Sequence, residues 1–415
     1  MTGVGLFAAV LLLYTLVSKR LAGTAVSPAL VFALSGLAVG VAGGADIEPH
    51  ALKSGAQEAV LLVAELALAL LLFADAASLG LRRLRAESSL PDRLLGIGLP
   101  LTIAAGVLGA LALFGQLDVW ETLLLAALLG PTDAALAAPV VSDRRIPARV
   151  RTALDAEAGL NDGVCVPIVT FALAATVAQE GSPAHGLAHE ALVIIGGGLV
   201  VGVVAGAAGG RLVALAIARR TLAPAYEQMG LAALALVSFF AADAIGASGF
   251  IAAFVAGLVA AAPLGDRRRR LTEFMEQDGQ LLSFAVFYIF GILAAGLLDD
   301  VTWAVAGYAV LSLTVVRMVP VALALIGSGL RPPTIAFMGW FGPRGIASIA
   351  LLFVVIGEEH GLPGLGTIET TVVATVFLSI VLHAVSAPPL IRRYAATLRD
   401  RASSGSGDAA GRTLG

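Results

Sequence analysis

Apolar runs long enough to cross a lipid bilayer follow one another along almost the whole sequence. A membrane-spanning helix needs about 20 consecutive apolar residues. Only 13% of the residues are charged, against ~25% in an average soluble protein. The sequence therefore predicts an all-α polytopic protein of the cell inner (plasma) membrane. The expected spans lie near 4–18, 25–42, 58–78, 94–114, 120–141, 152–178, 188–217, 226–243, 246–263, 279–298, 301–328, 334–356 and 367–390.

The basic residues predict how these thirteen spans are oriented. Cytoplasmic connections of membrane proteins are enriched in Lys and Arg, and every second connection of this chain is basic. Together these connections hold 23 of the 26 Lys and Arg residues, including the run Arg267–Arg270. We therefore expect 13 transmembrane helices, with the N-terminus outside and the C-terminus cytoplasmic. Residues 1–390 would form the membrane domain, and 391–415 a short, flexible cytoplasmic tail.

The fifth and twelfth spans contain Gly and Pro where a continuous helix would otherwise be expected. The fifth carries Gly130-Pro131-Thr132-Asp133, followed by Pro139, and the twelfth carries Gly342-Pro343-Arg344-Gly345. Proline removes a helical hydrogen bond and clashes with the preceding turn. Irregular backbone survives at membrane depth only where protein buries it or where it lines a cavity. A simple proline kink, with Thr132 bonded back to its own helix, is the alternative for the fifth span.

The spacing of these interruptions suggests an internal repeat. Interrupted spans at corresponding positions of two halves are typical of secondary transporters and mark the binding site. The fifth and twelfth spans are seven apart, an odd number that reverses orientation. We therefore expect two inverted six-helix repeats, about 1–178 and 226–390, with crossed discontinuous helices and a connector span at about 188–217.

The sixth span places polar side chains at membrane depth. Glu157, Asn161 and Asp162 lie within it, and an intramembrane charge costs at least ~2.5–3.5 kcal/mol on insertion scales. Such residues usually mark an ion or proton path. Pro167 leaves the carbonyl of Gly163 without its helical partner, which adds an oxygen acceptor beside Asp162. Oxygen-rich surroundings suit a hard cation, here a monovalent one such as sodium.

The intramembrane arginines, the cysteine and the histidines further limit which kinds of site are expected. Arg317 and Arg344 lie inside the eleventh and twelfth spans, so each needs an acidic partner or a water-filled cavity. The single cysteine, Cys165, excludes an intramolecular disulfide and argues against a cysteine metal site. Four of the five histidines lie in predicted loops, where they are expected to be solvated: His50, His185, His189 and His360.

Four stretches of the membrane region belong together as motifs. They are Glu157-Ala-Gly-Leu-Asn161-Asp162, Pro131-Thr132-Asp133, Ser248-Gly249-Phe250-Ile251-Ala252 with Asp243 upstream, and Gly342-Pro343-Arg344-Gly345. In this combination the chain resembles the monovalent cation/proton antiporters of the sodium/proton exchanger type, particularly the bacterial NhaP-like branch. The resemblance covers roughly residues 1–390.

The resemblance implies a cation- and proton-binding site. Asp162 would bind a cation and a proton in turn, and Asn161 would be its structural partner. Thr132 and Asp133 would line the site where the broken helices cross. Asp162 and Thr132 are thus the expected ligands of the monovalent cation. Many relatives carry a hydroxyl residue after the glutamate, and this chain has Ala158 there, so one expected side-chain ligand is missing.

The resemblance also assigns the buried charges. Glu157 would form a structural ion pair with Arg317, and losing one partner of a buried pair typically costs ~3–5 kcal/mol. Arg344 would neutralise acidic groups and helix ends at the crossing, with Asp133 and Asp243 left to compensate it. The acidic residue that the family has in its third span aligns with Asp75, or is missing, with Glu65 as an additional candidate.

The implied activity is electroneutral, one-to-one exchange of Na⁺ or Li⁺ for a proton, because Asn161 cannot titrate beside Asp162. A homodimer in the lipid bilayer is implied, and neither a cofactor, an enzymatic reaction nor a nucleic-acid partner is expected. A K⁺/H⁺ antiporter of the same architecture is the main alternative. A cation channel, or an intramembrane aspartyl protease using Asp133 and Asp162, would not need the two intramembrane arginines or the matched interruptions.

Overall fold

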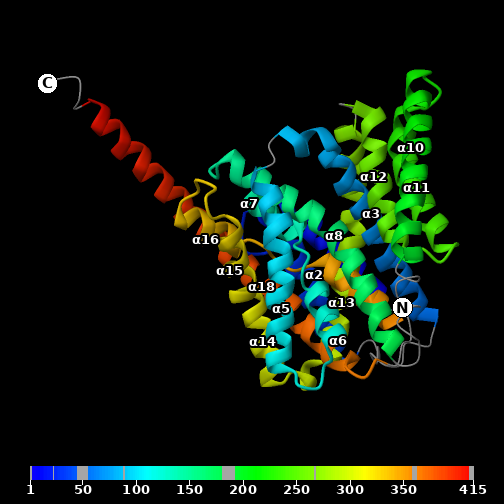
Figure 1. Cartoon of the computed structure of the whole chain (residues 1–415), viewed down its shortest axis with the longest axis horizontal. Helices are drawn as coiled ribbons and strands as arrows, with labels where there is room; N and C mark the ends of the chain where they lie inside the picture. The colour runs from blue at the N-terminus through cyan, green and yellow to red at the C-terminus, as the bar shows by residue number, and fades with distance from the viewer. Residues whose placement is uncertain are drawn as a thin grey trace.

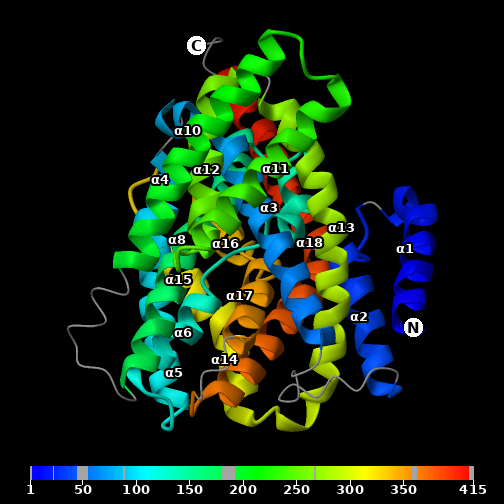
Figure 2. The same ribbon diagram turned by 90° about the vertical axis from the view of Figure 1, so that its right-hand side faces the viewer.

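The computed structural model describes residues 2–21, 23–43, 55–86, 89–179, 192–265, 268–357 and 362–410, and these form helices with short connections and no strand. Figures 1 and 2 show the helices packed side by side in one bundle. Eight helical stretches of the described chain are long and apolar enough to cross a membrane. Four further apolar helices are shorter, and two of them belong to interrupted spans.

Each of the thirteen expected spans coincides with a helix or with helices in direct succession. They are α1 (Thr2–Leu21), α2 (Pro28–Val41), α3 (Gly55–Ala86), α4 (Ser89–Arg93) with the π-helical η1 (Leu94–Gly98) and α5 (Leu99–Leu113), α6 (Val119–Leu128) with α7 (Ala134–Val141), α8 (Ala148–Gln179), the π-helical η2 (Leu192–Gly196) with α10 (Gly197–Ala218), α11 (Pro224–Asp243), α12 (Gly249–Leu264), α13 (Arg268–Gly296), α14 (Trp303–Leu313) with α15 (Val315–Ala324), α16 (Pro332–Trp340) with α17 (Ile346–Gly357), and α18 (Leu365–Ala410). The short 3₁₀ helix η4 (Leu298–Asp300) precedes α14. The number of membrane crossings, their orientation and the repeats stay predictions.

Both expected interruptions are present. Residues 129–133 separate α6 from α7, and residues 341–345 separate α16 from α17. The two non-helical segments meet, because the backbone N–H of Asp133 donates to the carbonyl of Pro343 over 2.8 Å. This bond joins segments more than 200 residues apart and satisfies backbone groups that the breaks leave unpaired. Pro139, by contrast, lies inside α7 without ending it.

The expected span 301–328 contains an interruption that the sequence did not predict. Thr314, with φ −112° and ψ −91°, separates α14 from α15. Its hydroxyl and its N–H both bond to the carbonyl of Val310, over 2.6 Å and 3.1 Å. Local bonds of this kind compete with the regular helical pattern. The break places Arg317 in the first turn of α15.

The C-terminal segment also differs from expectation. Residues from 391 onward were expected as a flexible tail, yet α18 continues to Ala410. Pro388 and Pro389 lie inside this helix without ending it. Ile391 and Tyr394 are buried against the bundle, which gives the start of the extension a packing reason to stay helical. Figure 1 shows the last part of α18 leaving the bundle.

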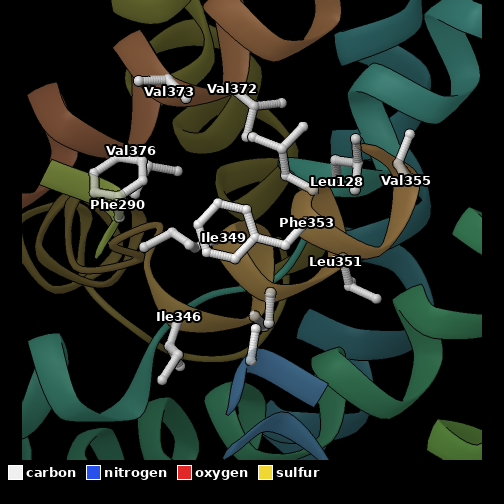
Figure 3. Packing of buried hydrophobic residues seen from close by; sticks show 14 of the residues in the cluster. Leu128, Phe290, Ile346, Ile349, Leu351, Phe353, Val355, Val372, Val373 and Val376 are labelled. Carbon is white, nitrogen blue, oxygen red and sulfur yellow. The ribbon is translucent and has the colours of Figure 1, made fainter. Parts of the chain in front are cut away.

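α17 lies at the centre of the largest hydrophobic cluster. A helix that is apolar on all sides is expected to be buried on all sides, and nearly every residue from Ile346 to Val355 is buried. Figure 3 shows Ile349 and Phe353 of this helix facing Phe290 of α13 and Val376 of α18. The helix that follows the second interruption is therefore part of the packed core. At the other extreme, α1 stands at the edge beside α2 (Figure 2).

Candidate functional site

α8 carries the polar residues of the sixth span into the middle of the bundle. Glu157, Asn161 and Asp162 are all buried there. Thr132, in the first interruption, faces the same region, since the side-chain amide of Asn161 donates to the Thr132 hydroxyl over 2.6 Å. A structural consequence is that the hydroxyl oxygen of Thr132 is fixed beside α8. The first interruption and α8 are thereby joined at the expected site.

Two buried oxygen atoms at this place lack a hydrogen-bond donor. Oδ1 of Asn161 and Oδ1 of Asp162 have no hydrogen-bond partner among the described residues. Buried polar groups are nearly always hydrogen-bonded, and exceptions call for an explanation such as a bound ion or water. The arrangement can therefore offer a carboxylate oxygen and an amide oxygen to a proton or a small cation.

Asp133 is engaged by backbone donors from both interrupted spans. Its Oδ1 accepts from the N–H of Leu136 over 2.9 Å, which caps α7, and its Oδ2 accepts from the N–H of Ile346 over 2.7 Å, at the start of α17. Negative charge is stabilised at helix N-termini. A Cβ atom on Gly345 would overlap this carboxylate, so the glycine permits the close approach. Asp133 lies at the crossing as expected, as a cap for two helices.

Arg344 occupies the complementary position. Its side chain is fully buried, and its Nη1 donates to the carbonyls of Gly130 and Pro131, the latter over 3.0 Å. These carbonyls follow the C-terminal end of α6, where the helix dipole favours positive charge. These contacts place the Arg344 guanidinium at the end of α6, and its neutralising role there stays a prediction. Its bonded acceptors are backbone carbonyls, and no carboxylate is among them.

Asp243 is not at the crossing. It is the last residue of α11 and is exposed, whereas Arg344 is completely buried. In the described chain no hydrogen bond or ion pair joins Asp243 to Arg344. Asp243 was expected beside Arg344 because it was one of the acidic residues left after Glu157 was paired with Arg317. A comparison of charged side chains does not include backbone carbonyls, which are the groups that accept hydrogen bonds from Arg344.

Glu157 and Arg317 form the ion pair that the resemblance implies. Nη1 and Nη2 of Arg317 donate to Oε1 and Oε2 of Glu157, the second over 2.9 Å, and both side chains are at most 3% exposed. A planar, two-bond contact of this kind is the strong geometry for an arginine and a carboxylate. A Cβ atom on Gly342 would overlap the Arg317 guanidinium, so the pair also touches the second interruption.

Two acidic residues of α3 were considered for the site. Asp75 interacts electrostatically with Asp162, as does Asp133. Both Asp75 and Glu65 are partly buried. Asp75 thus acts on Asp162 electrostatically, and whether Asp75 or Glu65 contributes a ligand stays a prediction.

Sequence reasoning missed three contributors. On α18, Ser379 bonds to Arg344 in the second interruption and His383 bonds to Trp340 directly before it, although the sequence signal was available: polar residues every fourth position in an otherwise apolar span. Phe254 of α12 packs so closely on Gly163, next to Asp162, that a Cβ atom there would overlap its ring. Nothing in the sequence distinguishes this phenylalanine from an ordinary core residue.

Comparisons with known proteins agree with this geometry. The chain matches the family described as "Sodium/hydrogen exchanger, transmembrane" over residues 6–393. It is 30% identical over 320 residues to the Na⁺/H⁺ antiporter NhaP of Pseudomonas aeruginosa, covering 70% of this chain and 72% of that protein. It is 29% identical over 181 residues to an uncharacterised Na⁺/H⁺ exchanger, YjcE, of Escherichia coli, covering 42% of this chain and 33% of that protein.

Solved structures show the same fold. The sodium proton antiporter MjNhaP1 of Methanocaldococcus jannaschii at pH 8 superimposes with a TM-score of 0.76 at 21% identity, covering 95% of this chain and 99% of that one. An electron-microscopy map of the same antiporter gives a TM-score of 0.72 at 20% identity, covering 95% and 97%. The helical bundle, the crossed interruptions and the family match lead to one conclusion: the chain is a multi-pass membrane protein of the sodium/hydrogen exchanger family.

Proposed function

We propose that this protein exchanges Na⁺ or Li⁺ for a proton across the inner membrane, electroneutrally and one for one, with Asp162 alternately protonated and cation-bound. The observation that carries the proposal is the buried Oδ1 of Asp162, which lacks a hydrogen-bond donor in the described chain and belongs to the residue directly after Asn161, whose amide bonds to Thr132. A buried carboxylate in this position needs a proton or a cation. The two ligands exclude each other at one carboxylate, which couples their movements.

Coordination would use neighbouring oxygen atoms. Asn161 Oδ1 is the second unpartnered buried oxygen, and the Thr132 hydroxyl is held within 2.6 Å of the Asn161 amide nitrogen. Sodium prefers such hard oxygen ligands, as other hard cations do. Ala158 supplies no hydroxyl, so the backbone carbonyl of Gly163, which Pro167 deprives of its helical partner, would add an oxygen to the shell.

The proposed stoichiometry is supported by the contacts of the two other site carboxylates, Glu157 and Asp133. Glu157 is paired with Arg317, and both Asp133 oxygens accept backbone hydrogen bonds. Asn161 cannot titrate. Asp162 is thus proposed as the single exchanging group, with Asp75 shaping its electrostatic surroundings.

Asp162→Asn tests the proposal most directly. Asparagine keeps the size of the side chain but can neither bind a proton nor neutralise a cation, so sodium-driven proton movement in everted vesicles should fall to the level of empty vesicles. The exposed Asp299 provides a matched control, and Asp299→Asn should retain exchange. Retained exchange in a correctly folded Asp162→Asn protein would contradict the assignment of Asp162.

Asn161→Asp tests the stoichiometry. A second titratable carboxylate beside Asp162 should allow an extra proton per cycle and make exchange electrogenic. The measurement is the response of proteoliposome exchange to an imposed membrane potential: absent in the parent protein, present in the variant. An Asn161→Asp protein whose exchange is still independent of potential would show that position 161 does not set the stoichiometry.

Potassium in place of sodium is the second candidate, since both are hard monovalent cations and selectivity depends on details of cavity size and ligand field. Proton release from the purified protein on addition of sodium, lithium or potassium would rank the three ions. The protease alternative is disfavoured because both Asp133 oxygens already cap helices. A channel would show flux that neither saturates nor depends on a proton gradient.

A further inference from the structure

α18 carries a ladder of buried polar residues. Thr371, Thr375, Ser379 and His383 follow one another at every fourth position, and none is more than 3% exposed. The first two hydroxyls donate to carbonyls of their own helix, over 2.6 Å and 2.7 Å. Such back-bonding is the ordinary way to bury a hydroxyl in an apolar helix. Ser379 and His383 instead reach across to the second interruption.

These two residues form a chain of three hydrogen bonds. The backbone N–H of Arg344 donates to Ser379 Oγ over 2.7 Å. The Ser379 hydroxyl hydrogen is then available for Nδ1 of His383, 3.2 Å away. On the other side of the ring, Nε2 lies 2.9 Å from the carbonyl of Trp340, which can only accept, so Nε2 carries the proton.

A neutral imidazole fits this chain. Nδ1 also lies 2.9 Å from the carbonyl of Ser379, which would accept from a protonated Nδ1 only. Arg344 and Arg317, both cationic, interact electrostatically with His383, and a neutral ring avoids a third positive charge there. In that tautomer each of the three bonds of the chain has one donor and one acceptor, and the contact of Nδ1 with the Ser379 carbonyl is not a hydrogen bond.

The two ends of this series of hydrogen bonds lie on the two sides of the second interruption. Trp340 is the last residue of α16, directly before segment 341–345, and Arg344 is the fourth residue of that segment, two residues before Ile346, the first residue of α17. We infer that Ser379 and His383 are positioning residues of the exchange site, an inference that rests on the exchange function proposed above. Their hydrogen bonds attach Trp340 and Arg344, on the two sides of the second interruption, to α18 and so hold Arg344 in place. We call these hydrogen bonds the staple.

The staple reaches the ion site through Arg344 and Pro343. Arg344 Nη1 bonds to the carbonyls of Gly130 and Pro131, which directly precede Thr132. The Pro343 carbonyl accepts from the N–H of Asp133, the residue after Thr132. Both flanks of Thr132 are therefore fixed by a segment that α18 holds. Outer partners of this kind typically change ion affinity or activity ~10–100-fold when removed.

Exchange kinetics in proteoliposomes test the staple. His383→Leu and Ser379→Ala should each raise the apparent KM for sodium about tenfold, with a smaller change in maximal rate, because the geometry of the ligands loosens while Asp162 is intact. His383→Gln keeps a donor for the Trp340 carbonyl, Ser379→Thr keeps the hydroxyl, and both should stay within about threefold of the parent KM. Thr375→Val, one turn away and bonded only within α18, is the matched control. Equal KM values in His383→Leu and Thr375→Val, or failure of both conservative variants to restore KM, would overturn the inference.

A second readout does not depend on transport. Cys165 is the single cysteine of the chain, is buried, and packs so closely on Gly130 that a Cβ atom there would lie 2.9 Å from its sulfur. Loosening of the crossing should expose it, so maleimide should label purified His383→Leu and Ser379→Ala protein about tenfold faster than the parent or Thr375→Val. Unchanged labelling would refute the staple. Absence of exchange in the parent protein would refute the proposed function and leave the labelling result to decide the staple.

Discussion

At the scale of single residues, three buried carboxylates of similar chemistry have three different surroundings. Glu157 faces a guanidinium, Asp133 faces two backbone N–H groups, and one oxygen of Asp162 has no donor in the described chain. A buried charge is tolerated when it is paired or hydrogen-bonded. The first two are compensated by the protein itself, so their removal should damage the scaffold, whereas changes at Asp162 should damage exchange.

The ion pair gives the first prediction at this scale. Arg317→Met leaves the Glu157 charge buried without its partner, which typically costs ~3–5 kcal/mol, so the thermal midpoint of the detergent-purified protein should fall sharply. Glu157→Gln combined with Arg317→Met should recover part of that loss, because no uncompensated charge is left.

An exposed ion pair of the same protein, Arg145 with Asp143, provides the control for the Arg317→Met experiment. Arg145 and Asp143 are 2.6 Å apart, with 46% of the Arg145 side chain exposed. Exposed pairs contribute ~0–1 kcal/mol, so Arg145→Met should leave the midpoint nearly unchanged. Equal midpoints for Arg317→Met and Arg145→Met would mean that the buried pair carries little of the stability.

Sequence could identify the buried charges but not all of their partners. The positions of Glu157 and Arg317 inside spans left an acidic partner or a water-filled cavity open for Arg317, the resemblance implied the pair with Glu157, and the structure contains that pair. Arg344 was different, because its acceptors are the carbonyls of Gly130 and Pro131. Every residue has a carbonyl, so only the backbone path of the interruption shows which ones are free.

At the scale of elements, the two crossed interruptions were predictable and the third was not. The proline of a Gly-Pro pair removes a helical hydrogen bond, so breaks at 129–133 and 341–345 were expected, with a simple proline kink as the alternative for the first, and the structure has both breaks. Thr314 has no such signature, since back-bonding threonines occur in many unbroken helices. The helical extension of α18 was missed for a similar reason: a short polar tail reads as flexible unless its buried contacts, here Ile391 and Tyr394, are known.

The crossing of the interrupted elements gives the next prediction. A Cβ atom on Gly345 would overlap the Asp133 carboxylate, so Gly345→Ala must push apart the α7 and α17 N-termini. Overpacking in a tight interior costs ~1–3 kcal/mol, and we expect exchange to drop at least about tenfold, because a small misplacement of binding groups is costly. Gly307→Ala, at a helical position with nothing within 4 Å of the added atom, should have no effect. Normal exchange in Gly345→Ala would show that the Asp133 cap can move without consequence.

At the scale of the whole molecule, the order of the chain brings distant segments to one centre. The first interruption, α8, the second interruption and α18 meet around Thr132 and Arg344, while α1 lies at the edge (Figure 2). Hydropathy predicted the elements but could not predict this order of packing, because lipid-facing and core-facing residues of a membrane helix are similarly apolar.

Orientation in the membrane is the last prediction, and it follows from charge alone. Gln116 lies in a connection without Lys or Arg, and Thr221 lies directly after Arg219 and Arg220. Three expected spans separate the two positions, an odd number, so they should lie on opposite sides of the membrane.

Both residues are exposed, and the single native cysteine is buried, so the parent protein should give little background labelling with a membrane-impermeant maleimide. In intact cells Gln116→Cys should react from outside, and Thr221→Cys should react only after permeabilisation. Reaction of both from the same side would mean that the span count between them is wrong, and the reverse pattern would mean that the basic connections do not mark the cytoplasm.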